Sequence, residues 1–346
     1  MYKDTFITLG KIFFAAATSA ECPGLETHVN ALKEISQNYH NYNGWFTEKF
    51  VKMQLLSLAT MLNENDLTRF EEVYSKGVVS DKTVKIIAAG NIPLVCFHDI
   101  FCVLFSGKKC VVKFSQKDRL LPFAVMEILK ALNPELKDRF IEEKDERIAF
   151  DAIIATGSNN SSRYFDYYFS KYPHIIRRNR NSVAVFSGKE TEEDLKNIGK
   201  DIFAYYGLGC RSVSKIFVPQ NYDFQDFFKH IVEFSDVINN PKYADNYDYN
   251  KAVYLMSGAK LLDNNFLLLK EDLSLSSPIG VLFYERYDDI EKLSEKLVLL
   301  SNEIQCVVSK SEIKGIKTES FGAAQNPSIF DFADGVDTMN FLKSII

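Results

Sequence analysis

The chain has 346 residues, of which 46% are hydrophobic and 25% are charged, and its formal net charge is -5 at pH 7. This length allows a large core and two domains with a terminal segment. The acidic balance excludes nonspecific nucleic-acid binding, which needs a basic face, and no apolar run is long enough for integral membrane association.

The spacing of the cysteines and histidines indicates the redox compartment and whether a zinc site is expected. The six cysteines show no CxxC spacing and no disulfide density, and the five histidines form no HxxxH or HExxH pair. These patterns indicate a reducing compartment and exclude a zinc site. Residues 12–20 resemble a short apolar signal core, but Asp4 lies where a signal peptide is basic. We therefore expect a mature cytoplasmic protein.

In the first half of the chain, the predicted secondary structure changes near Thr83 from helices to alternating strands and helices. Residues 2 to about 75 are predicted to be mainly helical, with helices at Leu25–Ser36 and Phe46–Leu62. Beyond Thr83, short apolar strands at 83–90, 108–115 and 150–155 alternate with helices at 91–107 and 120–132. This alternation predicts a parallel sheet, in which ligands bind beyond the carboxyl ends of the strands.

Polar or glycine clusters follow three of these predicted strands. They are Gly90-Asn91, the run from Lys113 to Gln116, and the run from Thr156 to Ser158. The last opens TGSNNSS, which suits phosphate binding at a helix N-terminus, although the same residues suit an ordinary helix cap. Residues 174–180, HIIRRNR, either contact cofactor or coenzyme A phosphates or form a solvated turn. Their place just after the sheet favours phosphate.

The second half is organised around Cys210. A helix at Thr191–Tyr206 begins with a capping box, and Cys210 follows two glycines and precedes a strand at Val213–Val218. Glycines let backbone N–H groups approach an oxyanion, and Arg211 can favour the thiolate, so this setting suits a nucleophile. A structural cysteine after a helix-ending glycine is the alternative.

The remaining elements complete a second α/β unit. We predict a helix at Phe224–Phe234, a polar loop at 239–250, a strand at Gly280–Tyr284, a helix at Asp289–Leu300 and a strand at Ile304–Val308.

Four motifs in order resemble the aldehyde dehydrogenase superfamily, and most closely its acyl-CoA reductase branch, typified by the fatty acid reductase component of luminous bacteria. The motifs are GNIP at 90–93, VVKFSQ at 111–116, ATGS at 155–158 and GLGCRSVSKIFVP at 207–219. The resemblance covers residues 83–308.

The resemblance implies an α/β fold of two parallel-sheet domains with N-terminal helices. The expected parts are an N-terminal helical segment at 1–78 that packs on the cofactor domain, a Rossmann-like NAD(P)-binding domain at 79–180, a catalytic domain at 181–310 and a C-terminal segment at 311–346.

The resemblance also implies roles for residues. Cys210 is the expected nucleophile and Asn91 the expected half of an oxyanion hole. The residues expected to bind the cofactor are Lys113, Ser115, Gln116, Thr156, Gly157 and Ser158. Gln116 replaces an acid that would repel a 2′-phosphate, which favours NADPH, with NADH as the alternative. Arg177, Arg178 and Arg211 are expected to contact substrate or phosphate, and no metal is expected.

The resemblance therefore implies NADPH-dependent reduction of an acyl-CoA, with fatty acyl favoured, to an aldehyde through a thioester on Cys210. Arg177 or Arg178 aligns with the superfamily glutamate that activates water, so the thioester is expected to resist hydrolysis. The alternatives are a small acyl-CoA or acyl phosphate substrate, or a catalytically silent binding protein. The last is suggested by SLSSPIGV at 274–281, which lacks the acid that holds the nicotinamide ribose. An acyl-donating enzyme and a second copy of the chain are the further expected partners.

Overall fold

The computed structural model describes residues 2–74, 79–144 and 148–345. The chain divides into two compact units, called here unit 1 (Met1–Asn179 with Asn326–Ile346) and unit 2 (Arg180–Gln325). The segment expected to start at residue 311 is therefore shared between the two units. The expected boundary after residue 78 falls at residues 75–78, outside the described part of the chain.

Unit 1 begins with four helices that share one core with its sheet. They are α1 (Lys3–Thr18), α2 (Glu26–Tyr42), α3 (Glu48–Met61) and α4 (Glu64–Tyr74). The apolar face of α1, with Phe6, Leu9 and Ile12, is fully buried in that core, and the Phe6 and Phe101 rings meet edge to face at 4.8 Å. Burial of this face is what stabilises a helix of this composition, so residues 12–20 belong largely to a core helix.

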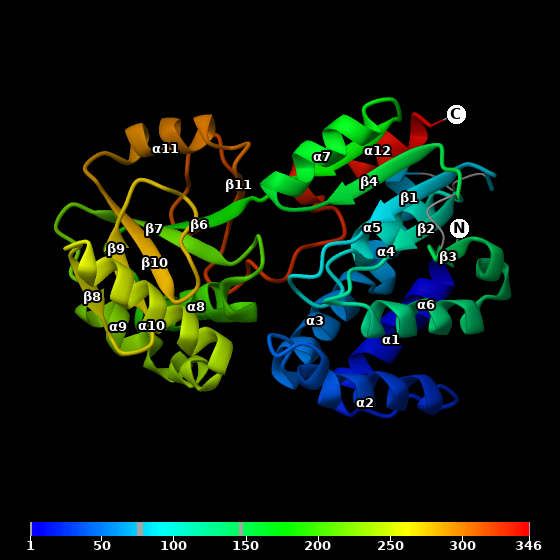
Figure 1. Cartoon of the computed structure of the whole chain (residues 1–346), viewed down its shortest axis with the longest axis horizontal. Coiled ribbons are helices and arrows are strands. Elements are labelled where there is room, and N and C mark those ends of the chain that lie inside the picture. The colour runs from blue at the N-terminus through cyan, green and yellow to red at the C-terminus, as the bar shows by residue number, and fades with distance from the viewer. Residues whose placement is uncertain (1, 75–78, 145–147, 346) are drawn as a thin grey trace. The chain divides into compact units, whose positions relative to one another are not determined.

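The sheet of unit 1 is parallel throughout, as the alternating pattern predicts. Its strand order is β3-β2-β1-β4-β5. The strands are β1 (Thr83–Ile87), β2 (Lys109–Lys113), β3 (Phe140–Glu142), β4 (Ala152–Thr156) and β5 (His174–Arg177), and the helices are α5 (Phe97–Phe105), α6 (Leu120–Leu132), α7 (Asn159–Phe169) and α12 (Thr338–Lys343). Figure 1 shows α7 and α6 on opposite faces of this sheet. The strand order reverses between β1 and β4, which is where open α/β sheets bind ligands.

Unit 2 has a seven-stranded sheet of order β12-β11-β6-β7-β10-β9-β8. The strands are β6 (Asn181–Val185), β7 (Val213–Pro219), β8 (Leu261–Asp263), β9 (Leu268–Glu271), β10 (Val281–Tyr287), β11 (Ile304–Ser309) and β12 (Thr318–Glu319). The β8–β9 pair is antiparallel, and the other strand pairs of this sheet are parallel, so the second sheet is mixed, with one antiparallel edge strand. Helix α11 (Ile290–Leu299) lies on one face, and α8 (Glu192–Phe203), α9 (Gln225–Ile231) and α10 lie on the other (Figure 1).

The segment predicted as a polar loop at 239–250 is instead the start of α10 (Pro241–Met256). Asn240 caps this helix by accepting from the Lys242 and Tyr243 N–H groups, and proline occupies the first helical position. Tyr243 and Tyr247 are buried one turn apart, and the Tyr243 hydroxyl donates to the Phe266 carbonyl at 2.9 Å. The tyrosines supply an apolar face that a count of polar residues does not reveal.

Candidate active site

The loop that carries Cys210 leaves α8 through an unusual backbone path. After Phe203 come two consecutive non-glycine residues in the left-handed region, Tyr205 at φ 51° and Tyr206 at φ 56°, and then Gly207 at φ 79°. Left-handed tyrosines cost free energy that surrounding structure must offset. Both tyrosine side chains are buried, which supplies that compensation. The predicted helix at Thr191–Tyr206 therefore ends earlier, at Phe203, because the backbone leaves the α-helical region at Ala204, which has ψ 132°, and at the two left-handed tyrosines.

Hydrogen bonds hold both ends of this loop. The Ser212 hydroxyl donates to the Ala204 carbonyl at 3.2 Å, which joins the exit of the loop to its entry. The Ser182 hydroxyl, fully buried on β6, donates to the Cys210 carbonyl at 2.9 Å. Cys210 itself is half-buried. A half-buried thiol on a fixed loop is able to meet a substrate without first moving the backbone.

The other cysteines differ from Cys210 in burial. Cys96, Cys102 and Cys110 are fully buried, and desolvation raises the pKa of each thiol well above its usual value. Desolvation likewise raises the pKa of Cys306 to about 12. The thiolate is the reactive form, so these four thiols are poor nucleophiles. Only Cys22 and Cys210 are half-buried among the six.

A segment from the C-terminal part of unit 2, Phe321–Gln325, packs beside the Cys210 loop. Arg211 donates to the Ala324 carbonyl at 3.3 Å, and the Gln325 amide reaches the Ser212 hydroxyl at 3.5 Å. The Arg211 guanidinium also lowers the pKa of Cys306, against the larger effect of burial. Arg211 therefore helps to hold this segment, while its predicted contact with substrate or phosphate stays a prediction.

Asp201 on α8 fixes that same segment. Its side chain is fully buried and accepts from the Gly322 N–H at 2.6 Å and from the Ala324 N–H at 3.1 Å. Burial raises the pKa of Asp201 to about 7, and the two N–H groups oppose that rise. Sequence reasoning missed this residue. The available signal was an acid among the buried positions of α8, next to Ile202.

In unit 1, the loops after β1 and β2 lie in direct contact at the carboxyl edge of the sheet. A Cβ on Gly90 would lie 2.4 Å from the Ser115 Oγ and 2.7 Å from the Ser115 Cβ. The Ala88 N–H donates to the Lys113 carbonyl at 3.0 Å. Only glycine fits at position 90, and it brings Asn91, which is exposed, beside the loop that begins at Ser115.

Asp118 ties these loops to the N-terminal helices. It is 1% exposed; the Tyr39 hydroxyl on α2 donates to it at 2.6 Å, and the Leu94 N–H donates at 2.7 Å. Leu94 has φ 54°, so this hydrogen bond supports a strained backbone. Burial raises the pKa of Asp118 to about 7. Asp118 was also missed by sequence reasoning, because its partner Tyr39 lies 79 residues away.

The turn after β4 combines a helix cap with a close approach. The Ser158 Oγ accepts from the Ser161 N–H at 3.2 Å, so Ser158 is the N-cap of α7. A Cβ on Gly157 would lie 2.8 Å from the Ser161 Cβ and 2.9 Å from the Phe165 ring. Glycine here lets the backbone pass close to the first turn of α7, whose N–H groups favour anions. Thr156 is half-buried at the end of β4.

These loops suit the diphosphate and ribose of a dinucleotide. They lie beyond the carboxyl ends of β2, β1 and β4, which are neighbours in the sheet, and two of them need glycine for steric reasons. Lys113 and Gln116 are exposed and Ser115 is half-buried at the same edge. The Gln116 carbonyl accepts from the Tyr42 hydroxyl, which holds the backbone while the side chain faces solvent.

Arg177 does not fit the predicted contact with substrate or phosphate. It lies in β5, not in a turn, and it is 3% exposed. It forms two hydrogen bonds to the Asp99 carboxylate, at 2.6 and 3.3 Å, and also donates to the Ala333 carbonyl and the Thr338 hydroxyl. This guanidinium is used inside unit 1, where it holds the C-terminal residues against α5.

Arg178, the next residue, differs from Arg177 in burial. It is exposed and pairs with Asp166 on α7 at 2.8 Å. A surface pair of this kind contributes little to stability and leaves the guanidinium accessible.

Among the described residues, no group of three or more His, Cys, Asp or Glu side chains is arranged to hold a metal ion. No described helix combines the length and the apolar character that a membrane span requires.

Solved structures share this architecture. Aldehyde dehydrogenase 21 from Physcomitrella patens, in complex with the reaction product succinate, is 13% identical, with a TM-score of 0.64 over 88% of this chain and 74% of that chain. The aldehyde dehydrogenase KauB from Pseudomonas aeruginosa is 14% identical, with a TM-score of 0.60 over 90% of this chain and 71% of that chain. An oxidoreductase from Marinobacter aquaeolei is 12% identical, with a TM-score of 0.61 over 89% and 73%. The chain therefore has the aldehyde dehydrogenase fold.

The sequence itself identifies the branch. The family model described as acyl-CoA reductase (LuxC) matches residues 26–237, which is more than half of the chain. The protein belongs to this acyl-CoA reductase family, and the resemblance read from the four motifs is confirmed. No curated protein sequence gives a significant match.

Proposed function

We propose that the protein reduces an acyl-CoA to the corresponding aldehyde with a nicotinamide cofactor, through a thioester on Cys210. The observation that carries this proposal is the Cys210 loop. It is a strained, hydrogen-bonded turn that holds a half-buried thiol, in a chain that belongs to an acyl-CoA reductase family. Strain of this kind concentrates at functional sites.

In the proposed reaction, the Cys210 thiolate attacks the carbonyl carbon of the acyl-CoA thioester. A bond forms between the Cys210 Sγ and that carbon, and the electron pair of the C=O π bond moves to oxygen. The Cys210 backbone N–H is the proposed donor to this oxyanion. The resemblance predicts that the Asn91 side chain is the second donor to the oxyanion, and this role stays a prediction. When the C=O bond re-forms, the bond to the coenzyme A sulfur breaks, and the leaving thiolate takes up a proton.

The loops after β1, β2 and β4 are the proposed cofactor site. Thr156, Gly157 and the N-terminus of α7 would hold the diphosphate, and Lys113 and Ser115 the ribose. When bound, the cofactor supplies the hydride that reduces the acyl carbonyl. The bond between that carbon and the Cys210 Sγ then breaks, which releases the aldehyde and restores the thiolate. The exposed Gln116 places no negative charge beside a 2′-phosphate, which favours NADPH.

The fate of the thioester depends on which groups can activate water. The position that aligns with the hydrolytic glutamate of the superfamily carries Arg177 or Arg178, which are cationic and are paired with Asp99 and Asp166. A guanidinium cannot accept a proton from water, so this position supplies no general base. The thioester is therefore expected to persist until it is reduced.

Mass spectrometry after incubation with an acyl-CoA and no cofactor tests this proposal. We expect a stable acyl adduct on Cys210 that is absent in Cys210→Ala, which should lose reductase activity by several orders of magnitude. Cys22→Ala is the matched control, because Cys22 is the other half-buried thiol, and it should keep the adduct. An unmodified Cys210 in folded protein would contradict the mechanism.

A further inference from the structure

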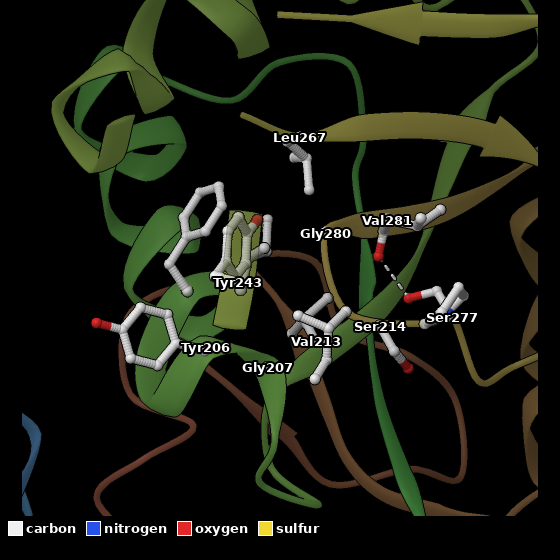
Figure 2. Close-up of a pocket in the computed structure, with 13 residues that line it drawn as sticks. Tyr206, Gly207, Val213, Ser214, Tyr243, Leu267, Ser277, Gly280 and Val281 are labelled. Carbon is white, nitrogen blue, oxygen red and sulfur yellow. Dashed lines mark hydrogen bonds between the residues drawn. The ribbon is translucent and has the colours of Figure 1, made fainter. Parts of the chain in front are cut away.

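The loop that carries Cys210 is short and closes on itself. Gly207 and Val213, which flank the tip of the loop, line one small cavity (Figure 2), and the Ser212 hydroxyl donates to the Ala204 carbonyl at 3.2 Å. The residues that line this cavity do not include Cys210, so the tip of the loop lies outside it. Which groups the loop offers beside the thiol therefore depends on the backbone conformation of the tip.

The tip is a type I β-turn with Cys210 and Arg211 at its two central positions. The Ser212 N–H donates to the Gly209 carbonyl at 3.0 Å, which is the bond that closes a β-turn. Neither central residue has a positive φ, which excludes types II, I′ and II′, and Arg211 is not a proline, which excludes type VI. Both central residues of a type I turn are close to the helical conformation, so their N–H groups point to one side of the turn and their carbonyls to the other.

Ser182 determines which side of the turn faces the sheet. Its hydroxyl, fully buried on β6, donates to the Cys210 carbonyl at 2.9 Å, so this carbonyl points toward β6. The C=O and N–H groups of a planar trans peptide point in opposite directions. The Arg211 N–H, which belongs to the same peptide as the Cys210 carbonyl, therefore points away from Ser182.

The Arg211 N–H has no acceptor among the residues that the structure describes. The hydrogen bond that Arg211 donates to a described residue comes from its guanidinium, which meets the Ala324 carbonyl at 3.3 Å. The hydrogen bond of the turn itself uses the N–H of the next residue, Ser212. Arg211 is also only half-buried. A backbone N–H that is fixed in direction and not used within the protein is a preorganised donor.

The thiol leans to the side of the turn to which these N–H groups point. In a residue of helical conformation the Cα–Cβ bond is tilted toward the N-terminal end, which is also the direction of the N–H groups. A carbonyl carbon attacked by the Cys210 Sγ would therefore develop its negative oxygen beside the N–H groups of Cys210 and Arg211. Two fixed N–H donors at that place are what stabilises such an oxyanion.

The strands on both sides of Ser182 are irregular at this position. Between the partners of Ser182 and Val183, β7 has one extra residue, Ser214. Between the partners of Asn181 and Ser182, β11 has one extra residue, Gln305. Bulges of this kind occur next to active sites, where they change the direction of a side chain. Two irregularities around one strand position indicate that the direction of the Ser182 side chain is under constraint.

From these observations we infer that the Arg211 backbone N–H is a donor to the oxyanion formed in the Cys210 reaction, beside the Cys210 N–H, and that Ser182 is the positioning residue that orients it. The inference rests on the proposed function. It assigns two donors to one turn of unit 2. Hydride addition to the thioester also moves the C=O electron pair to oxygen, so the same donors act in acylation and in reduction.

Ser182→Ala tests the orientation of the turn. Two reactions of Cys210 are followed by mass spectrometry without cofactor: acylation by a fatty acyl-CoA, which forms an oxyanion, and alkylation by iodoacetamide, which forms none. Loss of a whole oxyanion donor costs roughly 10²–10³-fold, so a misdirected one should slow acylation by about 10- to 100-fold. The alkylation rate should stay unchanged. Ser182→Thr keeps the hydroxyl and should restore much of the acylation rate.

Ser214→Ala is the matched control for Ser182→Ala. Ser214 lies on the neighbouring strand β7, and its hydroxyl donates to the Leu275 carbonyl at 2.7 Å and not to the turn. The ratio of acylation to alkylation should remain that of the wild type. A Ser182→Ala protein in which both reactions slow alike would overturn the positioning role, because a general structural defect affects both.

The donor itself is tested by an α-hydroxy acid at position 211, compared with the amino acid of the same side chain at that position. This exchange replaces the N–H by an ester oxygen, and acylation should fall by about 10²–10³-fold with alkylation unchanged. Equal acylation rates in the two proteins would overturn the inference alone. Absence of any acyl adduct on Cys210 in folded wild-type protein would overturn the proposed function and this inference with it. Where Ser182→Ala does not fold, the comparison at position 211 decides.

Discussion

In each unit of the protein a deeply buried carboxylate holds a candidate functional loop or the segment beside it, but the two carboxylates are bonded differently. In unit 1, Asp118 accepts from one backbone N–H and from the Tyr39 hydroxyl. In unit 2, Asp201 accepts from two backbone N–H groups of the segment beside the Cys210 loop. Both pKa values are raised to about 7, chiefly by desolvation.

The difference lies in what a mutation can remove. The Asp118 arrangement contains a side-chain partner, so one hydrogen bond can be deleted while the carboxylate stays. Within the described part of the chain, the Asp201 side chain has only backbone donors, so this arrangement is lost as a whole when the carboxylate is removed. A buried N–H without an acceptor costs more than the hydrogen bond contributed, and unit 2 is therefore expected to be the more sensitive of the two.

The largest expected effect is that of Asp201→Ala. The buried Ala324 N–H and the half-buried Gly322 N–H lose their acceptor. A buried N–H without an acceptor costs roughly 1–3 kcal/mol and the half-buried one less, so the free energy of unfolding should fall by about 2–4 kcal/mol. Adduct formation on Cys210 should slow as well, since Ala324 also contacts Arg211. Urea unfolding followed by circular dichroism measures the stability. Glu193→Ala, an exposed acid on the same helix, is the control and should change it by less than about 0.5 kcal/mol. Equal effects of the two variants would remove the role given to Asp201.

The second largest expected effect is the pH dependence of stability that the Asp201 carboxyl causes. Asp201 has its pKa raised from 3.8 to about 7, so between these values it is protonated in the folded protein and ionised in the unfolded chain. Its stabilising contribution is complete below about pH 4 and is lost as pH rises toward 7, at about 1.4 kcal/mol for each unit of pKa shift. Asp201→Asn should flatten this slope and Glu193→Gln should not. An unchanged slope in Asp201→Asn would show that the carboxyl is not buried in the protonated form.

Gly157→Ala probes the proposed cofactor loop of unit 1. The added Cβ meets Ser161 and Phe165 below 3.0 Å, so the turn must shift, at a cost of about 1–3 kcal/mol in stability. Calorimetry should show weaker NADPH binding. Adding Ser161→Gly removes one of the two clashes and should restore part of the affinity. Unaltered NADPH affinity in Gly157→Ala would move the diphosphate away from this turn.

Tyr39→Phe is expected to have the smallest effect. It removes the hydroxyl that donates to Asp118 and accepts from the buried Leu121 N–H at 3.3 Å. Asp118 and the Leu94 N–H stay paired, so the loss is about 1–2 kcal/mol. Trp45, the only tryptophan, is close in sequence to Phe46, whose ring lies 5.3 Å from that of Tyr39. Its fluorescence therefore follows unfolding of this region. A loss as large as that of Asp201→Ala would contradict the distinction drawn between the two carboxylates.

Elements with a strong local pattern were predictable from sequence. The helix predicted at 120–132 has those bounds in the structure, and the capping box predicted at Thr191 is formed with Asp194. Helix α10 was missed because its apolar face consists of tyrosines, which count as polar in a loop pattern. The β8–β9 hairpin was missed because its strands are only three and four residues long.

The sequence by itself determined the parallel sheet of unit 1, the family and the candidate nucleophile, because strand and helix periodicity, caps and short motifs are local properties. Tertiary structure decided which polar groups pair inside the core. Arg177 meets Asp99 from 78 residues away, and Asp201 meets Gly322 from 121 residues away. A buried charge takes whichever partner the packing brings to it, and no local spacing encodes that choice. The same packing buries the Arg177 guanidinium in unit 1 and pairs it with Asp99.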